Sequence, residues 1–211
     1  MLRAAIFDMG NVLIDWDPRV VYRPHFASEN ELEIFMNGLF ARMQQAIHAT
    51  DLAMADALAP LKTVYPDDVV LIELFERGWF DFLRGPMAQS LAVVDALAAQ
   101  KVPLYGLTNW PRPVWPPLCS RGVHDYGFLA LFDDILVSGQ EALAKPDPAI
   151  FERALARFEL EPREVVFIDD LPVNVEAAEA LGMTGHCFVS ADHLETDLVR
   201  LGLLSKDVPA R

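Results

Sequence analysis

The sequence predicts an α/β fold, in which a parallel β-sheet is flanked by helices and a helical segment is inserted after the first strand. Two observations support this class: the two kinds of segment and their alternating order along the chain. Short apolar runs typical of buried strands alternate along the chain with longer segments whose apolar residues recur at helical spacing. Such alternation is typical of a parallel sheet, because each connection between parallel strands usually contains a helix. The 211 residues suit one domain with an insertion, or two small domains.

The strands are predicted from short apolar runs that end in polar residues. The first, RAAIF, covers residues 3–7 and is followed at once by an acid. The others show the same pattern, and they cover residues 102–109 with a terminal loop, 134–139, 165–170 and 186–190. Because each run is short and bounded by polar or glycine residues, a strand is favoured over a helix.

The helices of the same region are predicted from apolar residues three or four positions apart. Residues 88–100, AQSLAVVDALAAQ, carry such a pattern. A second helix is predicted over 146–160, where a proline lies near the first turn, a position that proline favours. A third is predicted over 172–182, and Gly182 is expected to end it.

Residues 16–86 interrupt the alternation of predicted strands and helices. They are rich in Leu, Ala, Met and Phe at helical spacings, and no strand alternation is evident. Pro60 and Pro66 are the expected helix breaks, since proline cannot donate the hydrogen bond that a helix interior needs. The segment is therefore predicted to be a helical insertion that forms a small second domain. Residues 109–118 are predicted to form a proline-rich loop.

The composition of the chain narrows the range of its possible functions. The formal charge of −14 argues against a nucleic-acid partner, which an excess of Lys and Arg would bind. A small phosphorylated substrate remains compatible, because a metal or a few local cations can reverse the field in a pocket. Cys119 and Cys187 fit neither a metal site nor a disulfide framework. Asp8 interrupts the N-terminal apolar run too early for a signal peptide, and no run is long enough to span a bilayer. We expect a cytoplasmic protein, monomeric or homodimeric, that does not bind membranes.

Polar residues follow three of the predicted strands. Asp8 ends the first, Thr108 and Asn109 end the second, and Asp169 and Asp170 end a later one. In an open parallel sheet, ligands bind beyond the carboxyl ends of the strands. Carboxylates gathered at one edge repel each other and need a cation to stay ionised. Oxygen ligands with a substrate phosphate suit magnesium, so Mg²⁺ is the predicted cofactor.

The same residues suggest a reaction. Lys145 precedes the predicted helix at 146–160 and is expected at the same face of the sheet. A phosphoryl group would then bridge the metal ion and Lys145, and Asp8 would attack phosphorus to form an aspartyl phosphate. Thr108 or nearby backbone N–H groups would hold phosphoryl oxygens, and Lys145 would offset the negative charge.

Four short motifs resemble those of a known family. In chain order, FDMGNVL, GLTN, AKPDPAIF and VVFIDD are similar to the four motifs of the haloacid dehalogenase-like (HAD) superfamily. The resemblance covers roughly residues 1–14 and 87–190. It implies a Rossmann-like core over residues 1–15 and 87–211, and a helical C1 cap over 16–86. The start of the chain is most similar to the branch of bacterial sugar-1-phosphate phosphatases that includes alpha-glucose-1-phosphatase.

The resemblance also implies roles for individual residues. Asp8 matches the nucleophile, and Lys145 the lysine of the third motif. Thr108 and Asn109 match the phosphate-binding motif. The implied metal ligands are Asp8, the backbone carbonyl of Gly10, Asp169 and Asp170. The resemblance does not decide which of Asp169 and Asp170 contacts the ion directly.

Gly10 departs from the family pattern. Most family phosphatases have Asp at this position, where it protonates the leaving group and later activates water. Glycine keeps the carbonyl and removes the general acid–base catalyst, which typically contributes about 10²–10⁴-fold. Slow turnover is therefore expected. Sugar 1-phosphates would tolerate the loss best, because an anomeric hydroxyl is a more acidic leaving group than an ordinary alcohol.

Several other residues have alternative interpretations. Asp15 and Asp17 form a second D-x-D, which we interpret as a solvated turn before the first inserted helix rather than a replacement acid–base pair. The aromatic residues Trp16, Trp110 and Trp115 would stack on a sugar, or simply pack. The polar residues Gln44, Gln45 and His48 lie in the insertion and are candidate substrate contacts. The remaining histidines, His25, His124, His186 and His193, show no ligand spacing.

Two further functions remain open from the sequence. A 2-haloacid dehalogenase also uses an Asp nucleophile without an acid two positions later. It needs no metal, however, so the paired Asp169 and Asp170 would lack a role. A non-catalytic binding or regulatory protein with the same fold is the other alternative, and Gly10 is the feature that favours it.

Overall fold

A computed structural model describes residues 1–112 and 124–205 of the chain. Trp115 and Cys119 lie outside the described residues, as does most of the predicted loop 109–118. Within the described part, no helix is both long enough and apolar enough to span a bilayer.

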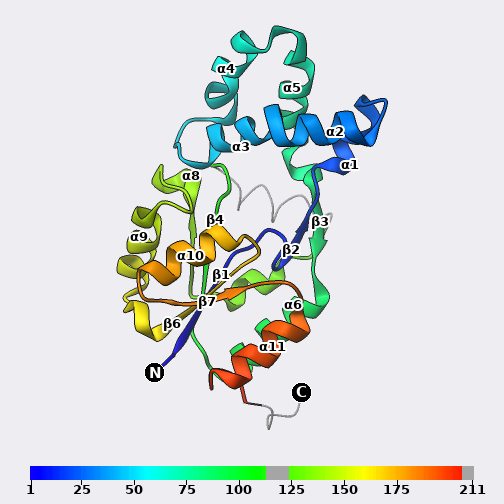
Figure 1. The fold of residues 1–211 in the computed structure, drawn as a ribbon. Helices are drawn as coiled ribbons and strands as arrows, with labels where there is room; N and C mark the ends of the chain where they lie inside the picture. The colour runs from blue at the N-terminus through cyan, green and yellow to red at the C-terminus, as the bar shows by residue number, and fades with distance from the viewer. Residues whose placement is uncertain (113–123, 206–211) are drawn as a thin grey trace.

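The centre of the molecule is a five-stranded sheet with the order β5-β4-β1-β6-β7 (Figure 1). Every neighbouring pair is parallel. The predicted α/β class is confirmed. The first strand lies at the centre, between the strands that end in the predicted phosphate and acidic motifs. The bounds are β1 Ala4–Phe7, β4 Leu104–Thr108, β5 Asp134–Val137, β6 Val165–Asp169 and β7 Thr184–Cys187.

Helices cover both faces of this sheet (Figure 1). Side chains alternate along a strand, so β1 contributes to two cores. Ala5 and Phe7 pack with α6 and α11, whereas Ala4 and Ile6 pack with α9 and α10. The bounds are α6 Ala88–Ala99, α9 Pro148–Phe158, α10 Pro172–Ala180 and α11 Ala191–Arg200, with a single turn, α8 Ser138–Glu141, after β5.

The segment after the first strand is largely helical and lies beyond one end of the sheet, at the top of Figure 1. Its interior is aromatic: Tyr22 lies 4.7 Å from Phe35 and 5.5 Å from Phe40, ring centroid to centroid. The helices are α1 Arg19–Tyr22, α2 Glu29–Phe35, α3 Ala41–His48, α4 Met54–Val64 and α5 Val69–Gly78, with a π-helical turn Met36–Phe40 and 3₁₀ turns Arg23–His25, Pro66–Asp68 and Trp79–Phe82.

Two strands join this helical segment to the sheet. β2 (Ile14–Trp16) pairs antiparallel with β3 (Leu83–Pro86). The sequence shows no strand alternation over residues 16–86 and predicted a helical insertion, whereas the structure places β3 within this range. Each strand is too short to show a period, and the pairing joins residues about seventy positions apart in the sequence. The domain division at residues 16 and 86 stays a prediction.

Three other boundaries differ from those expected. Pro60 lies inside α4 rather than ending it, because it is on the exposed side, where water can solvate the carbonyl left without a donor. β5 ends at Val137, since residues 138–141 form a helical turn. β7 covers 184–187 instead of 186–190, because the Ser190 side chain accepts a hydrogen bond from the His193 N–H and begins α11.

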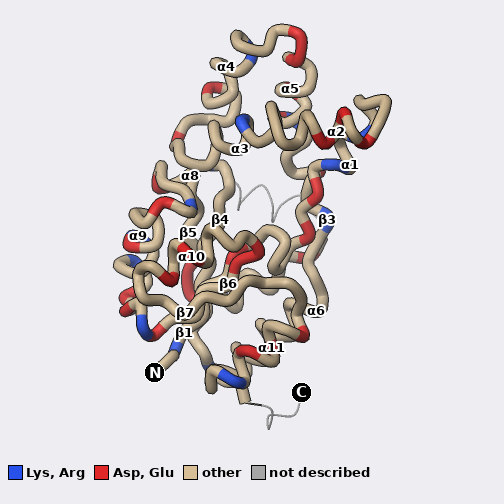
Figure 2. The backbone as a smooth tube through the Cα atoms, in the orientation of Figure 1, with Lys and Arg blue, Asp and Glu red and all other residues tan. Residues whose placement is uncertain are grey.

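The charge is spread over the whole described chain. Figure 2 shows Lys and Arg scattered singly among more numerous Asp and Glu, on the sheet region and on the helical segment alike. The sequence has 31 acidic and 17 basic residues. A continuous basic stripe of the kind that binds a phosphate backbone is absent from the described residues.

Candidate active site

The predicted site residues gather at the carboxyl ends of β1, β4 and β6. Asp8 follows β1 directly, and its N–H donates to the carbonyl of Ile168 on β6 at 2.8 Å. Thr108 and Asp169 are the last residues of β4 and β6. Because β1 lies between these two strands, the structure brings Asp8 between the second and fourth motifs.

Lys145 is buried at the centre of this group. Its Nζ lies 3.0 Å from Asp8 Oδ1 and 2.6 Å from Asp169 Oδ2, and it donates to the carbonyl of Leu107 at 2.8 Å. The contacts with Asp169 and Leu107 are hydrogen bonds, and the contact with Asp8 is an ion pair. Burial lowers the pKa of Lys145, but the charges of Asp8 and Asp169 outweigh burial and raise it above its ordinary value. The lysine is therefore a fixed positive charge.

Asn109 holds the Lys145 backbone in place. Its Nδ2 donates to the Lys145 carbonyl at 2.8 Å, and its Oδ1 accepts from the Lys145 N–H at 2.9 Å. Thr108 differs, because its buried Oγ1 has no hydrogen-bond partner among the described residues. A buried hydroxyl without a partner is unfavourable unless a ligand or water completes it. Thr108 is thus the better placed of the two to contact a phosphoryl oxygen.

The two acids of the fourth motif have different surroundings. Asp169 is fully buried and accepts hydrogen bonds from Lys145, from the Leu171 N–H at 2.9 Å and from Asn174 Nδ2 at 3.0 Å. Asp170 lines the cavity that the site opens into, and Asp169 does not. The sequence analysis missed Asn174, although its place on the first turn of α10, five residues after Asp169, was a usable signal.

The loop after Asp8 is held by Asn11, which the sequence analysis also missed. Asn11 has a φ of +55°, in the left-handed region that Asn tolerates better than most residues. Its Oδ1 accepts from the Trp16 N–H at 3.2 Å, and its Nδ2 lies 3.5 Å from Asp170 Oδ2. Asn11 therefore ties the Gly10 turn to both the acidic motif and β2.

The electrostatics of the acids favour a bound cation. Burial, together with the charges of Asp169 and Asp170, raises the pKa of Asp8 from 3.8 to about 7, even though Lys145 opposes the shift. Burial and the charge of Asp169 also raise the pKa of Asp170. One carboxylate oxygen from each of the three acids lies within 4.8 Å of the others. A hard divalent ion fits this all-oxygen set and would favour the ionised forms of Asp8 and Asp170.

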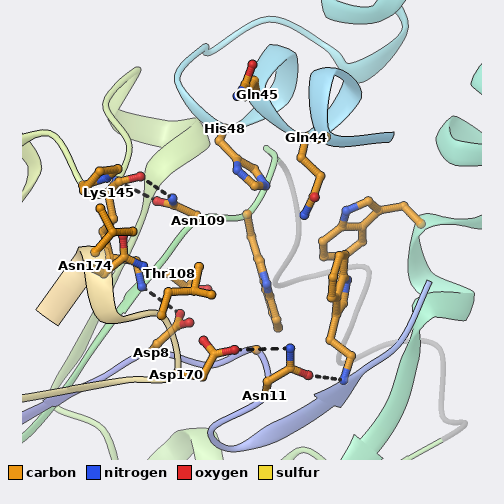
Figure 3. A pocket seen from close by; sticks show the side chains of 18 residues that line it. Asp8, Asn11, Gln44, Gln45, His48, Thr108, Asn109, Lys145, Asp170 and Asn174 are labelled. Carbon is orange, nitrogen blue, oxygen red and sulfur yellow. Dashed lines mark hydrogen bonds and ion pairs between the residues drawn. The ribbon is translucent and has the colours of Figure 1, made fainter. Parts of the chain in front are cut away.

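A cavity of about 410 Å³ lies between the strand ends and the helical segment. Its floor carries Asp8, Thr108, Lys145 and Asp170. Figure 3 shows His48 and Gln44 extending from α3 toward this floor. The remaining walls contain the aromatic residues Trp16, Trp79 and Trp110 and, at the rim, the exposed residues Gln45, Leu171 and Val173.

The tryptophans pack as well as line the cavity. Trp110 meets Trp79 edge to face, with ring centroids 5.5 Å apart, and Trp16 lies 6.0 Å from Phe40. The second D-x-D remains outside the cavity lining. Asp15 and Asp17 face Arg84 at 3.5 and 3.7 Å, and Asp17 Oδ1 accepts from the Arg19 N–H at 3.0 Å. This geometry agrees with a solvated turn before α1.

The pKa of His48 is unusually low for a histidine. Burial, assisted by the charge of Lys145, lowers the pKa of His48 from 6.5 to about 4. Between these two values the unfolded chain binds a proton at His48 that the folded chain does not. Stability contributed by the neutral imidazole is therefore complete above about pH 6.5 and is lost as the pH falls toward 4.

We expect His48→Gln to reduce this pH dependence. The unfolding free energy of the wild type should fall relative to that of the variant by on the order of 2 kcal/mol between pH 7 and pH 4. One pKa unit corresponds to about 1.4 kcal/mol, and partial exposure weakens the effect. Urea unfolding of both proteins across this range measures the difference. Parallel curves would show that His48 titrates normally.

A second cluster, between β7 and α11, was not predicted from the sequence. His186 Nδ1 lies 2.9 Å from Asp197 Oδ2, and His193 Nε2 lies 3.9 Å from the same oxygen. The expectation that the histidines show no ligand spacing is wrong for His186 and His193, which form with Asp197 a group that could hold a metal ion. His193 and Asp197 lie four residues apart on one helix, which was the available signal; His186 reaches them only through the packing of β7.

The chain is similar in sequence to known hydrolases and phosphatases. The family model for haloacid dehalogenase-like hydrolases matches residues 2–182. The sesquiterpene phosphatase astK of Aspergillus oryzae is 32% identical over 183 residues, which cover 87% of this chain and 88% of that protein. The flavin mononucleotide hydrolase 1 of Arabidopsis thaliana is 32% identical over 127 residues, 60% of this chain and 48% of that protein.

A solved structure is also similar. It is a HAD-family enzyme of Bacteroides thetaiotaomicron in a magnesium complex, with a TM-score of 0.65 and 22% identity over 94% of this chain and 98% of that one. At this level of identity the likeness concerns the fold.

Proposed function

The chain belongs to the haloacid dehalogenase-like hydrolase family, and we propose that it is a magnesium-dependent phosphatase of a small phosphorylated metabolite. The observation that carries the proposal is the grouping of Asp8, Lys145, Asp169 and Asp170 around the floor of one cavity. The similarity to phosphatases supports it. We also propose that residues 16–86 act as a C1-type cap.

The site residues suggest how the reaction proceeds. Asp8, the Gly10 carbonyl and Asp170 would hold Mg²⁺. Asp169 would orient Lys145 and add a negative charge beside the ion. The ion, when bound, supplies charge neutralisation for the carboxylates and the phosphoryl group. Asp8 attacks phosphorus, the bond to the leaving oxygen breaks, and water later hydrolyses the aspartyl phosphate. Lys145 stabilises charge on the transferred group, and Thr108 donates to one of its oxygens.

We propose a sugar 1-phosphate as the substrate class to test first. Its anomeric oxygen leaves more easily than an ordinary alkoxide, which suits a site with Gly10. The aromatic residues Trp16 and Trp110 and the amide of Gln44 line the same cavity, and they offer stacking surfaces and hydrogen bonds for a sugar. The protein is further proposed to be cytoplasmic, as a monomer or homodimer, without nucleic-acid or membrane partners.

The proposal predicts activity that depends on the metal. Phosphate release should be measured on a panel of phosphorylated metabolites in excess Mg²⁺ and in EDTA. We expect turnover with Mg²⁺, highest for sugar 1-phosphates, and none with EDTA. Mg²⁺ should also raise the melting temperature of the wild type more than that of Asp170→Asn, because only a ligand that binds the folded state stabilises it.

Two results would replace the proposal by an alternative. Full activity on 2-chloropropionate in EDTA would identify a haloacid dehalogenase. A lack of turnover across the panel, at high enzyme concentration with Mg²⁺, would identify a non-catalytic binding protein, which Gly10 favours.

A further inference from the structure

The proposed phosphatase lacks an acid at Gly10, so another group has to protonate a poor leaving group. Four titratable side chains line the cavity among the described residues: Asp8, His48, Lys145 and Asp170. Asp8 and Lys145 form an ion pair, and Asp170 belongs to the acidic cluster. His48 has no hydrogen-bond or ion-pair partner among the described residues, and it is the titratable group that does not belong to the floor.

His48 lies on the side of the cavity that the leaving group faces. In phosphoryl transfer, the attacking and leaving oxygens lie roughly in line across phosphorus. The attacking oxygen belongs to Asp8 on the floor, so the leaving oxygen points away from the floor. His48 is the last residue of α3 and extends from that helix toward the floor, as does Gln44 (Figure 3).

We propose that His48 is the general acid that replaces the missing aspartate and protonates the leaving oxygen. The inference rests on the proposed phosphatase function. As the bond from Asp8 Oδ to phosphorus forms and the bond from phosphorus to the substrate oxygen breaks, the imidazolium proton moves to that oxygen. The alcohol leaves neutral, and His48 becomes a neutral imidazole. Water that later attacks the aspartyl phosphate returns a proton to His48.

The charges around His48 explain how it obtains that proton. In the absence of phosphate, burial and the charge of Lys145 keep the imidazole neutral. The elements packed against α3 also carry charges: Glu141 on α8, and Asp56 and Lys62 on α4. A phosphate dianion entering the cavity adds two negative charges, which favour the imidazolium. The position of His48 at the carboxyl end of a helix acts in the same direction.

His48→Gln separates this role from simple binding. The glutamine keeps a hydrogen-bonding group and loses the proton. We expect kcat/KM to fall about 10²-fold on an alkyl phosphate, and much less on a nitrophenyl phosphate, whose leaving group needs no proton. The quantity kcat/KM includes departure of the alcohol and excludes hydrolysis of the aspartyl phosphate, so a slow second step does not disturb it.

Gln44→Ala is the matched control, because Gln44 lies one turn earlier on the same face of α3 and does not titrate. It should lower kcat/KM on both esters by the same factor. If His48→Gln also affects both esters equally, His48 only binds substrate and the inference is wrong. If neither ester is hydrolysed by the wild type with Mg²⁺, the phosphatase proposal itself fails.

An NMR titration tests the proton directly. The His48 imidazole signal, identified by its loss in His48→Gln, should titrate near pH 4 in the free protein. With Mg²⁺ and inorganic phosphate, its midpoint should move upward by at least about one pH unit, since a nearby charge typically shifts a pKa by about 1–3 units. A midpoint that phosphate leaves unchanged would contradict the inference.

Discussion

Replacing Asp8 with asparagine should abolish phosphate release, with kcat falling roughly 10⁴–10⁶-fold, as removal of a nucleophile does in other covalent enzymes. Asparagine keeps the shape of the side chain but cannot form the aspartyl phosphate. It also removes one of the two carboxylates that contact Lys145 Nζ. The measurement is steady-state phosphate release with Mg²⁺, on the best substrate of the panel.

The matched control is Asp15→Asn. Asp15 lies seven residues later, and its half-exposed carboxylate faces Arg84 rather than the cavity. This variant should keep activity close to that of the wild type, because an exposed ion pair contributes little. The melting temperature of Asp8→Asn shows whether the variant is folded. A folded Asp8→Asn protein with wild-type activity would refute Asp8 as the nucleophile.

Gly10→Asp should restore the activity that His48→Gln removes. On an alkyl phosphate we expect the double variant to exceed His48→Gln by about 10²-fold, because the aspartate resupplies a general acid. A Cβ atom at Gly10 would lie 3.7 Å from Trp110 Nε1 and 4.0 Å from Trp16 Cβ, both ordinary contacts. The backbone at Gly10 is also outside the left-handed region, so a Cβ atom there causes no backbone strain.

The same change in the wild type should have a much smaller effect, since His48 already supplies the proton. Gly10→Asn is the control, because it has the shape of aspartate without the acid, and it should rescue nothing. A gain from Gly10→Asp that is equal with and without His48 would show that the missing acid is not replaced. The chain would then simply be a slow phosphatase.

The strands and the main site residues were predictable because their signals are local. The motif around Asp8 is an apolar run followed by an acid, and the motif around Asp169 has the same form. Each tells where a strand ends. The carboxyl ends of parallel strands share one edge, so the convergence of Asp8, Thr108 and Asp169 follows from the fold class. The structure places β1 between β4 and β6, so Asp8 lies between Thr108 and Asp169.

The missed features depend on contacts that are distant in sequence. The β2–β3 pair joins Ile14 to Pro86, and strands of three and four residues leave no periodic signal. Asn11 is a polar residue in an unremarkable sequence context, and only its hydrogen bond to Asp170 reveals it. Boundaries such as the end of β7 depend on capping by Ser190.

The sequence by itself determined the fold class, the nucleophile candidate and the absence of the usual acid at Gly10, because these are properties of short motifs in a set order. Only the tertiary structure decided how the acids differ. Asp169 is buried against Lys145, whereas Asp170 faces the cavity. It also decided that His48, from α3, faces the Asp8 floor. Burial and the direction of a side chain across a cavity depend on how separate elements pack, which local patterns do not encode.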